Sequence, residues 1–104
     1  MATQSVVEIT DQNFESLISS DQPTLVDFWA PWCGPCRALG PTIDRLGDDF
    51  AGKATVGKLN IDEHPALAAK FGVASIPTVM VFQNGEAKKQ FVGLRPYEEY
   101  ADAL

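Results

Sequence analysis

An almost unbroken apolar run over residues 24–30 constrains the fold of this chain more than any other feature. Its only charged residue is Asp27. Apolar runs of this length fill strands that are buried on both faces of a sheet. After Cys33 the period changes, because apolar residues recur every three or four positions, as on one face of a helix. These residues are Cys36, Leu39, Ile43, Leu46 and Phe50. A buried strand that leads into an amphipathic helix predicts an α/β fold.

The remainder of the chain continues the alternation of strands and helices. Further strands are expected at residues 6–9, 55–61, 78–82 and 87–92. Further helices are expected around Phe14, Leu17 and Ile18, around Pro65, Leu67 and Phe71, and around Tyr97, Tyr100, Ala101 and Leu104. Thr10 or Asp11 is expected to cap the first of these helices, because both residue types accept hydrogen bonds from free helix amides. The expected order of elements is βαβαβαββα.

Asn84 and Gly85 separate the last two expected strands and favour a tight antiparallel hairpin. Alternation followed by a hairpin predicts a central mixed sheet, parallel in part, with helices on both faces. With 104 residues, the chain is expected to form a single domain over residues 1–104. Right-handed crossovers place the end of the apolar strand, and with it Cys33, at one edge of the sheet.

Charge and cysteine content limit the partners and the compartment. Fourteen acidic and eight basic residues give a net charge of −6, which repels nucleic acid and anionic membranes, so neither is an expected partner. Residues 1–5 lack the basic start and apolar core of a secretory signal, and no apolar run is long enough to span a membrane. Two cysteines cannot form the framework of several bridges found in small secreted domains. We expect a monomer that acts in the cytoplasm.

Cys33 and Cys36 lie where the buried strand turns into the helix. Their spacing places both sulfurs on one side of the first turn, where they can form a disulfide. Cys33 faces the free amides and the positive end of the helix dipole, which favour its thiolate. Pro35 suits the first helical turn, and Gly34 leaves room for another chain to approach. We expect Cys33 to attack a target disulfide and Cys36 to resolve the mixed disulfide.

A zinc site is the alternative interpretation of the two cysteines. The C-x-x-C pattern forms half of a zinc-ribbon motif, but zinc usually takes four ligands. Only His64 remains as a typical further ligand, and it is far away in the sequence. A single C-x-x-C near a βαβ pattern is more typical of redox chemistry, so no metal site is expected.

Asp27 needs an explanation because burial disfavours the charged form of a carboxyl group and raises its pKa. One interpretation is that Asp27 accepts and donates the proton of Cys36 during resolution. The other is that it pairs with Lys58 from the adjacent strand. Both can hold, and we favour the first.

The segment DFWAPWCGPC at residues 27–36 closely resembles the active-site segment of the thioredoxin family. Four later segments agree with the family in order and spacing: KLNID at 58–62, SIPT at 75–78, FQNG at 82–85 and VG at 92–93. The resemblance implies the thioredoxin fold and a general protein-disulfide reductase. It also implies that the peptide bond between Ile76 and Pro77 is cis and lies beside the cysteines.

The resemblance further implies a docking surface and a partner. The backbone of Ser75 and Ile76 is expected to pair with an extended segment of the target. The apolar docking surface is expected to consist of Trp32, Gly34, Pro35, Ile61, Ala74, Ile76 and Gly93. Thioredoxins are recycled by thioredoxin reductase, which draws electrons from NADPH through a flavin. This chain shows no nucleotide motif, so we expect no bound cofactor and only the redox-active disulfide of Cys33 and Cys36.

Two other functions compete with disulfide reduction. One is a dithiol enzyme of the same fold that oxidises or isomerises disulfides. Such relatives commonly carry a histidine between the cysteines, where this chain has Gly34 and Pro35. The other is a binding or scaffold subunit in which the cysteines are incidental. We expect a reductant that acts on disulfide-containing proteins.

Overall fold

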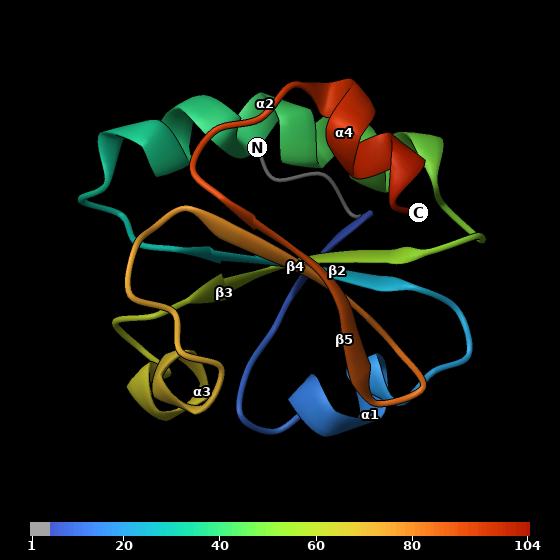
Figure 1. The fold of residues 1–104 in the computed structure, drawn as a ribbon, viewed down its shortest axis with the longest axis horizontal. Helices are drawn as coiled ribbons and strands as arrows, with labels where there is room; N and C mark the ends of the chain where they lie inside the picture. Colours follow the sequence, from blue (N-terminus) through green and yellow to red (C-terminus); the bar gives the residue numbers. More distant parts are fainter. Residues whose placement is uncertain (1–4) are drawn as a thin grey trace.

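A five-stranded mixed sheet forms the centre of the computed structural model, which describes residues 5–104 (Figure 1). Its strands are β1 (Val6–Glu8), β2 (Thr24–Trp29), β3 (Thr55–Asn60), β4 (Thr78–Gln83) and β5 (Glu86–Val92). Their order across the sheet is β1-β3-β2-β4-β5. β3 runs parallel to both β1 and β2, whereas β4 runs antiparallel to β2 and to β5. β2 is therefore paired on both sides at the centre of the sheet.

Within residues 5–104, four helices cover the two faces of this sheet. They are α1 (Phe14–Ile18), α2 (Gly34–Asp49), α3 (Pro65–Lys70) and α4 (Tyr97–Asp102). α2 and α4 lie on one face of the sheet, and α1 and α3 lie on the other (Figure 1). The order of elements and the mixed sheet confirm the α/β fold predicted from the sequence. In the described part of the chain no helix is long and apolar enough to cross a membrane.

The alternation of side chains along β2 creates two apolar cores, one on each face of the sheet. Val26 and Phe28 belong to the core under α1 and α3, together with Phe14. Leu25 belongs to the core under α2 and α4, together with Leu39. Because neighbouring residues of β2 contribute to opposite cores, both faces of this strand are buried, as its apolar sequence predicts.

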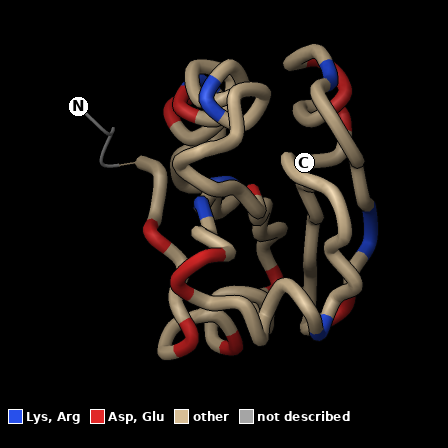
Figure 2. The backbone as a smooth tube through the Cα atoms, turned by 90° about the vertical axis from the view of Figure 1, so that its left-hand side faces the viewer, with Lys and Arg blue, Asp and Glu red and all other residues tan. Residues whose placement is uncertain are grey.

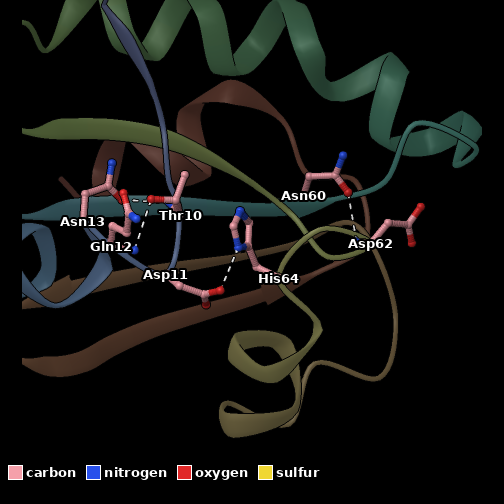
Figure 3. A network of polar contacts seen from close by, with 7 residues as sticks. All are labelled: Thr10, Asp11, Gln12, Asn13, Asn60, Asp62 and His64. Atoms are coloured by element: carbon pink, nitrogen blue, oxygen red, sulfur yellow. Dashed lines mark hydrogen bonds and ion pairs between the residues drawn. The ribbon is translucent and has the colours of Figure 1, made fainter.

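The start of α1 differs from the prediction, because its N-cap residue is Asn13 and not Thr10 or Asp11. The Asn13 side-chain oxygen accepts a hydrogen bond from the Thr10 N–H (2.7 Å), and Thr10 Oγ1 accepts one from the Gln12 N–H (3.2 Å) (Figure 3). Asp11 Oδ2 lies 3.0 Å from Nδ1 of His64, just before α3. Thr10, Asp11 and Asn13 are all residue types that suit an N-cap. Hydrogen bonds of Thr10 and Asn13 form a turn over residues 10–13, so α1 begins only after Asn13.

β4 and β5 form the predicted hairpin. Asn84 and Gly85 connect the two strands with φ angles of 55° and 82°. Both lie in the left-handed region, which asparagine and glycine adopt at lower cost than other residues and which matches the twist of the two strands. The pairing of the two strands is antiparallel, with a register shift between Val81 and Phe82.

α4 is short, but two of its side chains, Tyr97 and Tyr100, attach it to the rest of the fold. Tyr100 is fully buried, and its ring meets Phe91 of β5 edge to face, with 5.1 Å between the centroids. Tyr97 donates a hydrogen bond to Asp49 of α2 (2.5 Å), and the guanidinium of Arg45 lies 3.8 Å from the centroid of its ring. These contacts hold α4 against both the sheet and α2.

Acidic residues lie on several separate segments of the backbone (Figure 2). This distribution agrees with acidity that serves general solubility. Residues 1–4 lie outside the described residues, so the expectation that this terminus lacks a targeting signal rests on sequence alone.

Candidate active site

Cys33 and Cys36 form a disulfide at the N-terminus of α2, with their Cα atoms 5.3 Å apart. β2 ends at Trp29, and a short loop leads to Cys33, which is the extended N-cap residue of α2 (φ −91°, ψ 112°). Pro35 follows in the first turn, where its missing N–H removes no helical hydrogen bond. The strand, loop and helix place the two sulfurs together, as the sequence predicts.

Backbone groups surround the sulfur of Cys33. The N–H of Cys36 donates a hydrogen bond to Cys33 Sγ (3.2 Å). The same sulfur lies 3.8 Å from the carbonyl oxygen of Ile76, a position from which the reduced thiol can donate a hydrogen bond. An amide that points at a sulfur stabilises its thiolate, so the first turn of α2 supports nucleophilic chemistry at Cys33.

The two cysteines differ in exposure. Cys33 is 6% exposed, whereas Cys36 is 1% exposed. Both belong to a small apolar cluster on which Ile61 and Ile76 pack. Cys33 is therefore the more accessible cysteine for another molecule, and Cys36 is shielded from solvent.

The loop before β4 lies against the cysteines, because the end of β2 meets the start of β4 in the antiparallel pair. The Ile76–Pro77 peptide bond is cis, as the resemblance implies. The Pro77 carbonyl accepts a hydrogen bond from the N–H of Gly93 (2.9 Å), and the Ser75 carbonyl accepts one from the Thr78 hydroxyl (2.5 Å). The first bond ties the loop before β4 to the end of β5, and the second lies within that loop and the start of β4.

The residues expected to form the docking surface differ in exposure. Trp32 is 65% exposed, and its indole N–H donates a hydrogen bond to Asp62 (2.9 Å). The other exposed members are Gly34, Pro35 and Ala74, and the partly buried members are Ile61, Ile76 and Gly93. Ser75, whose backbone is expected to pair with the target, is exposed as well. The structure brings Ile61 and Ile76 against the cysteines and Gly93 against Pro77. Ala74 is exposed in the loop before them.

Asp27 lies fully buried in β2. It shares the face of Leu25, which packs toward α2, the helix that carries Cys36. Within residues 5–104 neither carboxylate oxygen has a hydrogen-bond partner. Burial raises the pKa of Asp27 to about 7, and the positive charge of Lys58 opposes this shift.

Lys58 is the residue of β3 directly opposite Asp27, so the two side chains lie on the same face of the sheet. Its ammonium group lies 4.4 Å from the centroid of the Trp29 ring. No ion pair joins Lys58 to Asp27 among the described residues, whose ion pairs involve other groups. Lys58 therefore acts on Asp27 from the neighbouring strand through its charge, which lowers the pKa of Asp27, and not through a direct ion pair.

Three apolar residues near the site were not singled out from the sequence. Trp29 packs against the cysteine cluster. Val92 and Leu94, on either side of Gly93, are each 50% exposed. Large apolar side chains that flank a glycine at the end of a strand are a signal that could have indicated an exposed binding edge.

A metal site finds no support in the geometry of the described residues. No group of three or more His, Cys, Asp or Glu side chains among them could hold a metal ion. His64, the further ligand considered from the sequence, instead contacts Asp11 (3.0 Å). A pocket beside β1 is lined in part by Trp29 and Lys58, but neither cysteine lines it.

Comparisons with known proteins agree with this geometry. Residues 5–104 match the family model described as Thioredoxin. A thioredoxin of Chlorobaculum thiosulfatiphilum is 50% identical over 90 residues, which cover 86% of this chain and 83% of that protein. A thioredoxin of Alicyclobacillus acidocaldarius is 45% identical over 95 residues, covering 91% and 90%. A thioredoxin of Staphylococcus haemolyticus is 48% identical over 100 residues, covering 96% and 95%.

Proposed function

Since this chain belongs to the thioredoxin family and is a thiol–disulfide oxidoreductase, we propose that it reduces disulfides of many target proteins and is recycled by a thioredoxin reductase. The observation that carries the proposal is the pair of cysteines at the start of α2, with the Cys36 N–H directed at the sulfur of Cys33. A sulfur that is reachable and stabilised as a thiolate suits attack on a disulfide of another protein.

The proposed reaction has two exchange steps. In the first, the Cys33 thiolate attacks one sulfur of the target disulfide, the target S–S bond breaks, and its other sulfur leaves as a thiolate. In the second, the Cys36 thiolate attacks Cys33, the Cys33–Cys36 bond forms, and the target leaves as a second thiolate. The target gains two electrons, and this chain is oxidised. The low exposure of Cys36 supports its role as the resolving cysteine.

We assign to Asp27 the exchange of a proton with Cys36 during the second step. A carboxyl group whose pKa is about 7 is present in both protonation states at neutral pH, so it can accept and donate a proton there. Its position on the face of β2 toward α2 supports this role. Lys58 has a supporting role, because its charge keeps the pKa of Asp27 from rising further.

Target recognition is proposed to use the backbone of Ser75 and Ile76 together with the docking surface around the cysteines. The loop that carries Ile76 lies 3.8 Å from the sulfur of Cys33, so a strand bound there would present its disulfide to that sulfur. Gly34, Pro35 and Pro77 are proposed to shape this surface. Recognition through backbone and apolar contacts suits many targets, since neither depends on one particular side chain.

Electrons are proposed to come from NADPH through the flavin of a separate thioredoxin reductase, which reduces the Cys33–Cys36 disulfide. We propose that the protein acts as a monomer in the cytoplasm, where thiols are kept reduced. In a coupled assay, oxidised protein with NADPH and a bacterial thioredoxin reductase should consume NADPH in proportion to insulin disulfides reduced. NADPH consumption that does not rise when this protein is added would contradict this route.

The reduction potential of the Cys33–Cys36 couple tests the direction of the reaction. Equilibration with a glutathione buffer should give a value more negative than about −250 mV, the region in which thioredoxins lie. A value above about −200 mV would instead indicate an oxidant or isomerase. The variant with serine at both Cys33 and Cys36 should have no reductase activity, and full biological activity in that variant would support a scaffold role.

A further inference from the structure

Tyr100 contacts the chain next to residues 92–94, which include Gly93 of the docking surface. Its side chain is fully buried, and its hydroxyl oxygen accepts a hydrogen bond from the backbone N–H of Arg95 (3.2 Å). Its ring meets Phe91 edge to face, with 5.1 Å between the centroids. Phe91 precedes residues 92–94 and Arg95 follows them. Tyr100 therefore contacts the ring of the residue before this segment and the backbone of the residue after it.

Residues 92–94 in turn contact the loop that lies over Cys33. The Gly93 N–H donates a hydrogen bond to the Pro77 carbonyl (2.9 Å), and Val92 is paired with Thr78 of β4. Val92 and Leu94 are each 50% exposed. Exposed apolar side chains that adjoin a reactive site are typical of a contact surface, so the conformation of this segment determines how they are presented.

We propose that Tyr100 is a positioning residue for target binding, which holds residues 92–95 so that Val92, Gly93 and Leu94 stand beside the cysteines. The inference rests on the proposed docking function. A tyrosine suits this role because its ring packs against the strand and its hydroxyl bonds to the loop. Burial raises the pKa of Tyr100, so the hydroxyl stays neutral at physiological pH.

Among residues 5–104, few other contacts can replace the hydroxyl of Tyr100. Beyond the bond from Gly93 to Pro77, the segment after Gly93 is held by an ion pair between Arg95 and Glu99 (3.2 Å). Both of those side chains are more than 40% exposed (44% and 43%), and exposed pairs of this kind contribute little. Loss of the hydroxyl therefore lowers the population of the binding-competent conformation, and the apparent affinity falls by the same factor.

Tyr100→Phe tests the proposal, because it removes the hydroxyl and keeps the ring. With insulin as the disulfide substrate and dithiothreitol as the electron source, we expect KM to rise, by at most about three- to tenfold, the range that corresponds to loss of one neutral hydrogen bond. We expect kcat to stay unchanged, since the cysteines are not altered. Reduction of the small disulfide 5,5′-dithiobis(2-nitrobenzoate), which is too small to span the docking surface, should also stay unchanged.

Tyr97→Phe is the matched control. It removes a hydroxyl from the same helix, but that hydroxyl bonds to Asp49 of α2 and not to residues 92–95. We expect no change in its KM for insulin. If Tyr100→Phe lowers the midpoint of thermal unfolding but leaves KM unchanged, the role of Tyr100 is only structural and the proposal is wrong. An equal rise in KM for both variants would overturn it as well.

Trp32→Ala separates this inference from the proposed function on which it rests. Trp32 is 65% exposed on the docking surface, so its removal should raise KM for insulin if that surface binds targets. A rise with Trp32→Ala and none with Tyr100→Phe refutes the positioning role alone. No rise with either variant contradicts both the docking surface and the inference.

Discussion

Replacement of Asp27 by asparagine should change how the stability of the fold depends on pH. Burial raises the pKa of Asp27 from 3.8 to about 7. The native state therefore binds this proton more tightly than the unfolded chain does. Protonation of Asp27 thereby stabilises the native state relative to the unfolded chain. This stabilisation is complete below pH 3.8 and is lost as the pH rises through about 7.

The magnitude follows from the two pKa values. Each pKa unit corresponds to about 1.4 kcal/mol, so the full effect is about 4 kcal/mol, and more than half of it falls between about pH 5 and pH 8. Asp27→Asn has no proton to lose at this position. The amide of the variant also lacks partners, but that cost does not change with pH. The difference in unfolding free energy between the variant and the parent should therefore grow in favour of the variant as the pH rises.

Urea unfolding of the oxidised protein, followed by tryptophan fluorescence at intervals from pH 5 to pH 8, measures this difference. Lys58→Met provides a second test, because removal of the charge that lowers the pKa of Asp27 should move the midpoint of the pH dependence above 7. The reasoning is wrong if the difference in unfolding free energy between Asp27→Asn and the parent varies by less than about 0.5 kcal/mol over this pH range. Burial would then not raise the pKa of Asp27.

Other substitutions test the chemistry and the core. Asp27→Asn should slow insulin turnover at pH 7 with the circular dichroism spectrum unchanged, and equal turnover would reduce Asp27 to a structural role. Cys36→Ser should accumulate a mixed disulfide with a target, visible as a mass adduct; Cys33→Ser should not, and an adduct on that variant would reverse the two assignments. Gly85→Ala should lower the unfolding free energy in urea by about 1–2 kcal/mol, because its φ is 82°, and no loss would argue against the left-handed turn. Phe14→Ala should cost about 3–5 kcal/mol in the same assay, because its ring is buried against Phe71 and Phe82; a loss below about 1 kcal/mol would contradict that packing.

Hydrophobic spacing predicted the elements of this fold well, because each core-facing pattern is strong. The run at β2 and the period of α2 identify the central βα unit, and Asn84–Gly85 identifies the hairpin. The start of α1 was wrong, since Thr10, Asp11 and Asn13 all suit an N-cap and the choice depends on hydrogen bonds among them and to Glu8. Local propensity cannot rank residues of the same capping type.

Some parts of the site could be predicted from local sequence, whereas others depend on how distant segments pack together. The positions of Cys33 and Cys36 follow from their spacing at the end of a strand. The placement of Ile76 and Gly93 beside them depends on strand order, and only the resemblance to the thioredoxin family suggested it. The contact from Tyr100 to Arg95 was not foreseen, because it forms only when α4 folds back against β5 and the loop between them.

The pairing of β2 on both sides has a consequence for local opening of the protein. β2 is bonded to β3 along one edge and to β4 along the other, whereas β1 and β5 lie at the margins of the sheet. The amides of β2 should exchange their hydrogens with solvent only through global unfolding, while those of the marginal strands exchange through fraying. Cys33 follows soon after the strand that frays least, so the turn from β2 into α2 keeps its geometry when the outer strands open.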